Sequence, residues 1–272
     1  KKLALIRKAL RGLHTDGMLM SALDDVAWTL NLRGRDVHCN PVFLSYLLIA
    51  PERATLFIDR RKLTPEVERY LSSVGVGVEE YAAVGKGLKD YFSYNILMDP
   101  KETGEVMPGY VDKHVKVVYA DSPVPAMKAV KTDAEIKGFK AAMLRDGVAM
   151  VKFLCWLQPA VEAGGQTEMS VDRKLTELRA EQKRFRDISF DTIAGYGPHG
   201  AIVHYEASPE TDVELRPEGF LLLDSGAQYQ DGTTDITRTI PLGPLTDEQC
   251  RIYTLVLKGH IRLAMAKFPD GA

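Results

Sequence analysis

Residues 219–240 have the sequence GFLLLDSGAQYQDGTTDITRTI, and this stretch predicts two neighbouring strands that carry acidic side chains. The apolar run Phe220–Leu223 leads directly into Asp224, and the returning strand carries Asp235 beyond the turn pair Asp231-Gly232. A carboxylate after such a run is costly to bury unless a cation or several hydrogen-bond donors meet it. The two aspartates therefore indicate the first half of a metal site for ions that prefer oxygen ligands.

The register of this hairpin decides how close the two aspartates lie. A two-residue turn at Asp231-Gly232 would pair Gln228 with Asp235 and leave Asp224 about two pairs away on the same face. A four-residue loop over 228–231 would instead place Asp224 directly opposite Asp235, and Gly226 would permit the bend that such a register needs. The spacing alone is equally consistent with an Asp224 that caps a turn and an Asp235 that is a solvated strand residue.

A glycine-rich stretch with histidines, GYGPHGAIVHY over residues 195–205, precedes this hairpin. The pattern predicts a strand over 201–205, with His204 at its end. A histidine in that place can donate a proton to a substrate group or shuttle one from it. A satisfied structural histidine is the alternative for the same pattern.

The first part of the chain predicts a mixed sheet covered by helices. Apolar runs at 43–50 and 54–58, separated by Pro51-Glu52-Arg53, predict a hairpin. Thr64 before Pro65 predicts the start of a helix, with a capping hydroxyl followed by proline. A connector with two prolines over 120–126 marks the boundary to a second domain.

The second part predicts an α+β arrangement of two helices, a run of antiparallel strands and a last helix. The strands are expected over 189–194, 201–205, 219–229 and 233–240. The first helix is expected from a capping box at Thr132 to about Leu157, the second over 167–185, and the last from a capping box at Thr246 to about Lys267. The apolar side of the first helix is predicted to consist of Ile136, Phe139, Ala142, Met143, Val148 and Val151.

The composition excludes several classes of protein. The chain has 272 residues, enough for about two domains at roughly 150 residues each. A formal net charge of -2 provides no electrostatic footprint for nucleic acid or an anionic membrane. Three scattered cysteines argue against a disulfide framework and against a cysteine-based zinc site. A cytoplasmic protein is expected.

The segments LLLDSGAQYQDGTTDITRT and GPHGAIVHY resemble the catalytic domain of the aminopeptidase P (Xaa-Pro aminopeptidase) family of pita-bread metallopeptidases. The segments ALDDVAWTLNLRG and DVHCNPVFLSY in the first half resemble the middle domain of the long, three-domain members. The resemblance thus covers essentially the whole chain. It implies a creatinase N-terminal-like α/β middle domain over residues 1–123, followed by an incomplete α+β pita-bread catalytic domain over 124–272.

The resemblance also implies roles for individual residues. Asp224 matches the family aspartate that binds one metal ion, and Asp235 matches the one that bridges two. His204 matches the histidine that contacts substrate near the metal centre and helps to handle protons. The implied cofactor is a pair of divalent ions, usually Mn²⁺ in this branch, with Zn²⁺ or Co²⁺ as alternatives. The implied substrates are peptides with proline at the second position.

The family's remaining metal ligands, a histidine and two glutamates, are not found in this sequence, nor is its N-terminal domain. We therefore expect the chain to be a piece of a larger protein and to be inactive alone. The resemblance implies that this larger protein is a homodimer. Two other functions stay open from the sequence: a pita-bread module that has lost catalysis and binds proteins, and a prolidase-like or creatinase-like hydrolase.

Overall fold

The computed structural model describes residues 1–269 and 271, which form two compact units, Lys1–Ala134 and Glu135–Ala272. The expected boundary at 123/124 lies before helix α5 (Val124–Ala129), whereas the observed division lies after it. Val124 explains this difference, because its side chain is fully buried in the hydrophobic core of the first unit. None of the helices in the described part of the chain has the length and apolar character that a membrane-spanning segment needs.

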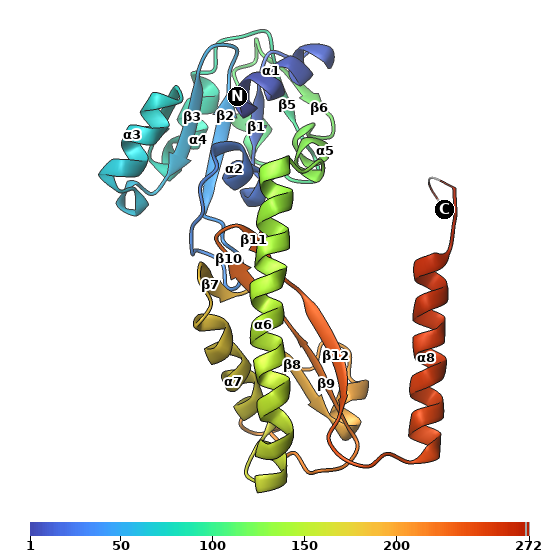
Figure 1. The fold of residues 1–272 in the computed structure, drawn as a ribbon. Helices are drawn as coiled ribbons and strands as arrows, with labels where there is room; N and C mark the ends of the chain where they lie inside the picture. Colours follow the sequence, from blue (N-terminus) through green and yellow to red (C-terminus); the bar gives the residue numbers. More distant parts are fainter. Residues whose placement is uncertain (270, 272) are drawn as a thin grey trace. The chain divides into compact units, whose positions relative to one another are not determined.

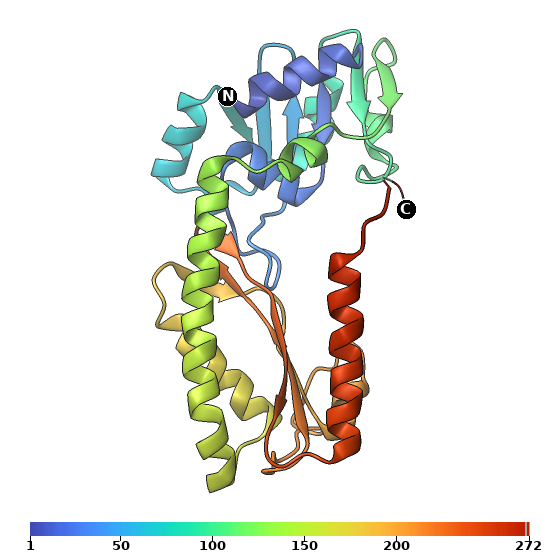
Figure 2. The same ribbon diagram turned by 45° about the vertical axis from the view of Figure 1, so that its right-hand side comes forward.

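The first unit is a six-stranded mixed sheet in the order β4-β3-β2-β1-β5-β6, with helices on both faces (Figure 1 and Figure 2). β2 pairs antiparallel with β1 and β3, while the pairs β3/β4, β1/β5 and β5/β6 are parallel. The strands are β1 (Met18–Met20), β2 (Ser45–Ile49), β3 (Ala54–Ile58), β4 (Val76–Glu79), β5 (Asn95–Met98) and β6 (Lys116–Tyr119). The remaining helices are α1 (Lys2–Gly12), α2 (Leu23–Leu30), α3 (Pro65–Ser73) and α4 (Val84–Lys89), with short 3₁₀ turns η1 (Arg60–Lys62), η2 (Tyr81–Ala83) and η3 (Met107–Tyr110).

Apolar side chains that alternate between the two faces along the central strands explain why both faces of this sheet are buried. In β2, Leu47 and Ile49 join the core cluster under α1, α2, α3 and α5, whereas Leu48 joins the cluster that includes Leu88 of α4. Successive side chains of a strand point to opposite faces, so an unbroken apolar run serves two cores. The predicted hairpin of β2 and β3 is confirmed, as is the Thr64 cap, whose hydroxyl accepts from the Val67 amide.

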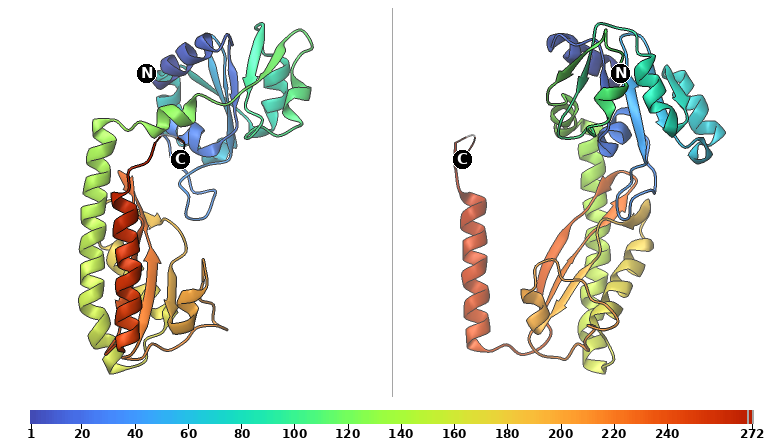
Figure 3. Two further views of the ribbon diagram at one scale, coloured as in Figure 1. Left: turned by 90° about the vertical axis from the view of Figure 1, so that its right-hand side faces the viewer. Right: turned by 180° about the vertical axis from the view of Figure 1, so that it is seen from behind.

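The second unit packs two helices against two small antiparallel sheets, β12-β9-β8 and β11-β10-β7 (Figure 1). The views in Figure 3 show α6 running alongside β8, β9 and β12. The two packed helices are α6 (Asp133–Ala163) and α7 (Glu168–Ala180); the unit also contains α8 (Asp247–Met265), which has no buried residues in the described structure, and the 3₁₀ turn η4 (Gly197–Ala201). The strands are β7 (Phe185–Ile188), β8 (Ile193–Tyr196), β9 (Phe220–Ser225), β10 (Ala227–Tyr229), β11 (Gly232–Thr233) and β12 (Ile236–Pro241).

The segments 220–229 and 232–241 run through both small sheets as one long bent hairpin. Its turn is at Gln230-Asp231, because Tyr229 pairs with Gly232. Both registers predicted from the sequence are therefore wrong. Asp231 occupies the turn because its carboxylate forms ion pairs with Arg145 of α6 and Arg184.

Gly226 lies where the hairpin passes from one small sheet to the other. An added Cβ there would meet the carbonyl oxygen of Thr234 at 2.0 Å and the hydroxyl of Ser189 at 2.2 Å. Both atoms belong to the local hydrogen-bond pattern, since the Ser189 hydroxyl donates to the Thr234 carbonyl at 2.9 Å. At the bend predicted for Gly226, the segments around Gly226, Ser189 and Thr234 thus approach one another closely.

Gly226→Ala is expected to lower the free energy of unfolding by about 1–3 kcal/mol, because the methyl group overfills a packed site. Gly147→Ala is the matched control: it lies within α6 and its added Cβ meets nothing within 4 Å. That change should stabilise the protein by about 0.5–1 kcal/mol, since alanine favours helix. Urea unfolding of both variants measures the difference, and equal effects of the two changes would contradict the packing argument.

The side of α6 that packs against the sheets differs from the predicted one. Of the residues predicted there, only Ala142 is buried; Phe139 and Val151 are exposed. The buried side includes small residues because the hairpin turn at Asp231 approaches α6 closely. A Cβ on Gly138 would lie 2.2 Å from the carbonyl oxygen of Asp231. The buried positions of α6 are Gly138, Ala142, Asp146, Ala149, Met150, Phe153, Leu157 and Val161.

Two buried charges tie the hairpin to the helices of the second unit. Arg179 of α7 and Asp146 of α6 form a bidentate ion pair, with Nε–Oδ1 at 2.8 Å and Nη2–Oδ2 at 3.0 Å, and both side chains are fully buried. The hydroxyl of Tyr229 in β10 donates to Asp146 at 3.0 Å, and burial together with the charge of Asp146 raises the pKa of this tyrosine. This network fixes the position of β10 relative to α6 and α7.

Candidate metal centre

Asp224 and Asp235 lie on one face of the β9/β12 pair. Asp224 pairs with Thr237 and Ser225 with Ile236, which places Asp235 diagonally across from Asp224. Diagonal neighbours on adjacent antiparallel strands share a face, and their side chains are within reach of each other. The opposite face carries Leu221 and Leu223, which are fully buried in the core beneath α6 and α7.

The two carboxyl groups are electrostatically coupled. Burial, the negative charge of Asp224 and a hydrogen bond between the two carboxyls together raise the pKa of Asp235. A like charge held this close favours the protonated form of one member of the pair. Asp224 in turn accepts a hydrogen bond from the Thr237 hydroxyl, with Oγ1 and Oδ1 2.7 Å apart.

This donor set fits hard divalent cations. Two carboxylates that face each other across neighbouring strands gain from a cation that neutralises both charges. Thr237 was not singled out in the sequence, although the alternation from Asp235 places it on the same face. Its hydroxyl orients the carboxylate of Asp224.

His204 does not lie in a strand, so the predicted strand over 201–205 is wrong. The 3₁₀ turn η4 ends at Ala201, and His204 follows in an exposed turn with a positive φ of 55°. Glycine residues at 195, 197 and 200 favour this compact loop over an extended strand. A Cβ on Gly195 would lie 2.9 Å from the backbone of Gly200, so the loop folds back closely on β8.

The loop that carries His204 packs on the same face of β9 as the two aspartates. A Cβ on Gly200 would lie 3.5 Å from the Cβ of Leu222, which shares its face of β9 with Asp224. Among the residues that the structure describes, His204 forms no hydrogen bond with either aspartate. The structure therefore brings Asp224 and Asp235 together and places the His204 loop over the face that they share.

The sequence did not point to a second polar cluster beside this loop. Glu168, at the start of α7, is fully buried, and its carboxylate accepts hydrogen bonds from His199 and Tyr205. A glutamate in a heavily charged helix carries no local pattern that marks it as buried. Thr167, which caps the helix immediately before it, was the only available signal.

Comparison with known proteins agrees with this fold and donor set. Residues 1–135 match the family model of the creatinase/prolidase N-terminal domain, and residues 137–272 match that of metallopeptidase family M24. The chain belongs to metallopeptidase family M24, with a creatinase N-terminal domain in front of the M24 domain. The predicted fold class is thereby confirmed, and the relatives described next confirm the resemblance to Xaa-Pro aminopeptidases.

Similar proteins in this family carry Xaa-Pro aminopeptidase names. Aminopeptidase P2 of Arabidopsis thaliana is 37% identical over 301 residues, which cover 99% of this chain and 42% of the plant protein. Xaa-Pro aminopeptidase 1 of Dictyostelium discoideum is 38% identical over 276 residues, which cover 99% of this chain and 43% of the Dictyostelium protein. The chain thus spans less than half the length of these curated relatives.

A solved structure of an X-prolyl aminopeptidase from Caenorhabditis elegans is similar over the full length of this chain. That structure, described as a cytosolic enzyme with a di-nuclear active site, has a TM-score of 0.90 and 34% identity, and the match covers 100% of this chain and 45% of that one. The Xaa-Pro dipeptidase from Bacillus anthracis shares the fold at a TM-score of 0.76 and 23% identity, and the match covers 96% of this chain and 70% of the dipeptidase.

Proposed function

We propose that the full-length protein to which this chain belongs is a metal-dependent aminopeptidase that removes the N-terminal residue from peptides with proline in second position, and that the chain alone is inactive. The observation that carries this proposal is the coupled pair Asp224 and Asp235 on one face of β9/β12 in a chain of family M24. The names of the similar proteins support the preference for proline.

The proposed cofactor is a pair of divalent metal ions, with Mn²⁺ as the preferred metal. Asp224 would bind one ion and Asp235 would bridge both. When bound, such a pair supplies Lewis-acid polarisation of the scissile carbonyl and a nucleophile that is ionised near neutral pH. The di-nuclear site of the nematode protein supports the number of ions.

The chain's own residues orient the ligands and handle protons in this proposal. Thr237 donates to Oδ1 of Asp224 and so orients the carboxylate that would bind an ion. Asp235, exposed in the described structure, needs no rearrangement of the core to reach a shared ion. His204 extends from its turn into solvent, where its imidazole can contact substrate and exchange a proton with it.

We further propose that the protein is cytoplasmic and a homodimer. The cytosolic description of the nematode protein supports the location. The homodimer follows from the resemblance to the long members of the family. Light scattering of the native protein tests the second point, and a monomer at micromolar concentration would exclude it.

The test of the proposed activity uses the full-length native protein, not this chain alone, loaded with Mn²⁺ and given four substrates: Ala-Pro-Ala, Ala-Ala-Ala, the dipeptide Ala-Pro, and creatine. We expect release of alanine from Ala-Pro-Ala only, with loss of activity in a chelator and recovery on addition of Mn²⁺. Cleavage confined to Ala-Pro would indicate a prolidase, and hydrolysis of creatine a creatinase. Metal binding without any turnover would favour the binding-module alternative.

A further inference from the structure

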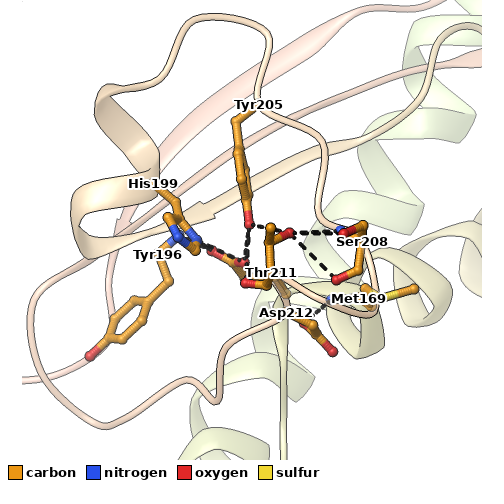
Figure 4. Close-up of polar contacts among 8 residues, drawn as sticks. Met169, Tyr196, His199, Tyr205, Ser208, Thr211 and Asp212 are labelled. Carbon is orange, nitrogen blue, oxygen red and sulfur yellow. Dashed lines mark hydrogen bonds and ion pairs between the residues drawn. The ribbon is translucent and has the colours of Figure 1, made fainter.

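A buried carboxylate outside the metal centre connects both ends of the loop that carries His204. Glu168 is 0% exposed, and its Oε1 accepts from the backbone amide of Tyr196 at 2.7 Å. Its Oε2 accepts from the hydroxyl of Tyr205 at 2.9 Å. The Nδ1 of His199 lies 2.9 Å from Oε1 and 3.1 Å from Oε2, and it donates, because a carboxylate only accepts (Figure 4).

These three donors span the loop from its first residue to its last. Tyr196 ends β8, His199 lies in the 3₁₀ turn, and Tyr205 follows His204 directly. The segment between them is rich in glycine and forms no strand that could hold it by a ladder of hydrogen bonds. Its conformation therefore depends on the carboxylate at which the donors converge.

Tyr205 holds His204 in an unfavourable backbone conformation. The φ of 55° at His204 is in the left-handed region, which residues other than glycine adopt uncommonly. Tyr205 constrains the chain at this point, because the residue is only 7% exposed, its ring centroid lies 4.5 Å from that of His199, and its hydroxyl lies between Glu168 and Thr211. The buried tyrosine turns the preceding histidine outward.

The carboxylate itself is held by a rigid element. Glu168 is the first residue of α7, and the helix is capped by the reciprocal hydrogen bonds of Thr167 and Ser170. The Glu168 amide donates to Val213 at 3.2 Å, and the Met169 amide donates to Asp212 at 3.0 Å. The helix is in turn fixed to the core by buried side chains, including Val171 and Leu175.

We propose that Glu168 is a positioning residue that sets the place of His204 relative to Asp224 and Asp235. This inference rests on the proposed function for the role of His204, but the coupling between Glu168 and the loop does not depend on it. Glu168 touches neither substrate nor metal in this proposal. It acts through Tyr196, His199 and Tyr205.

The test compares Glu168→Ala, Glu168→Gln and the matched control Glu177→Ala in the native protein. Glu177 is on the same helix, but its side chain is 67% exposed. We expect Glu168→Ala to raise amide hydrogen exchange over residues 197–205 selectively. Its kcat for Ala-Pro-Ala should fall on the order of 10²-fold, because a misplaced catalytic group costs about that much, while Mn²⁺ affinity is unchanged.

Glu168→Gln is expected to rescue most of the loss. The amide oxygen can still accept from Tyr196 and His199, while the amide NH₂ donates to the Tyr205 oxygen and the Tyr205 hydroxyl turns to Thr211. Glu177→Ala should match the wild type in both measurements. Tyr205→Phe provides a second test should Glu168→Ala fold poorly, since it removes the hydroxyl that contacts Glu168 and Thr211 and keeps the ring. It should show intermediate exchange over 197–205 and an intermediate kcat.

The two measurements separate this inference from the proposed function. If the wild type has no peptidase activity but Glu168→Ala still shows faster amide exchange over 197–205, the coupling between Glu168 and the loop would be supported and the proposed function would be contradicted. Lost turnover with unchanged exchange over 197–205 would overturn the positioning role. Wild-type exchange and wild-type kcat in Tyr205→Phe would overturn it as well.

Discussion

Asp235→Asn is expected to abolish binding of the metal pair and, with it, peptidase turnover. The change keeps the size of the side chain but removes the charge at the proposed bridging position, where an amide cannot serve two ions. Wild-type protein in Mn²⁺ at about 100 times its Kd should gain about 2.7 kcal/mol of stability, and the variant should gain none. Calorimetric titration of Mn²⁺ and thermal unfolding with and without Mn²⁺ measure both effects.

The same variant should be more stable than the wild type when no metal is present. The pKa of Asp235 is raised in the folded protein, because of burial and the charge of Asp224. A raised carboxyl pKa contributes stability below the unfolded-state pKa of about 4, and this contribution is lost as the pH rises through the folded-state pKa. The stability advantage of Asp235→Asn should therefore be absent at about pH 3 and present at neutral pH, and amount to at most about 1 kcal/mol because the pair is partly exposed.

Asp187→Asn is the matched control for these measurements. Asp187 is an exposed aspartate of β7 that pairs with Gln228 and lies in the other small sheet. Its replacement should leave Mn²⁺ binding and turnover as in the wild type. Retained Mn²⁺ binding in Asp235→Asn, or an equal loss in Asp187→Asn, would contradict the role proposed for Asp235.

The elements that local sequence determines were predicted well. The hairpin of β2 and β3 follows from two apolar runs around Pro51, and α3 and α8 begin at the predicted caps Thr64 and Thr246. In each case the interactions that decide the structure lie within a few residues of one another. A capping hydroxyl needs only the amide three residues on.

The hairpin of the candidate site was predicted in kind but not in register. The Asp-Gly pair is a turn signal in sequence, yet Asp231 is the second turn residue and Gly232 already pairs with Tyr229. The deciding interactions are long-range, because Arg145 and Arg184 lie far from Asp231 in sequence and bind its carboxylate. No local pattern contains that information.

The predictions of the buried side of α6 and of the conformation of the His204 loop were wrong for related reasons. Apolar size suggested that Phe139 and Val151 face the core, but the close approach of the hairpin to Gly138 selects the side with small residues. The run Ala201–Tyr205 is apolar enough for a strand, but Glu168 draws Tyr205 inward and leaves His204 in a turn. In both cases a tertiary contact overrides the local preference.

His204→Asn is expected to lower kcat by about 10²–10⁴-fold and leave Mn²⁺ binding unchanged, because a positioned proton donor or acceptor contributes about that much. Asparagine is the informative replacement, since it tolerates the left-handed φ of 55° at this position, whereas alanine would add backbone strain. A lowered kcat can then be assigned to the lost imidazole and not to a distorted loop. Single-turnover assays with Ala-Pro-Ala, alongside Mn²⁺ titration, give the two quantities.

The neighbouring residue provides the control for this last prediction. Val203 is 82% exposed in the same turn, and Val203→Ala changes the loop surface without touching the imidazole. It should leave kcat within about twofold of the wild type, as expected for an exposed position of this kind. Equal losses in Val203→Ala and His204→Asn would assign the effect to the loop as a whole, and lost Mn²⁺ binding in His204→Asn would make His204 a ligand. Separate effects, with turnover lost only at His204 and metal lost only at Asp235, would assign proton handling to the loop and metal binding to the strands.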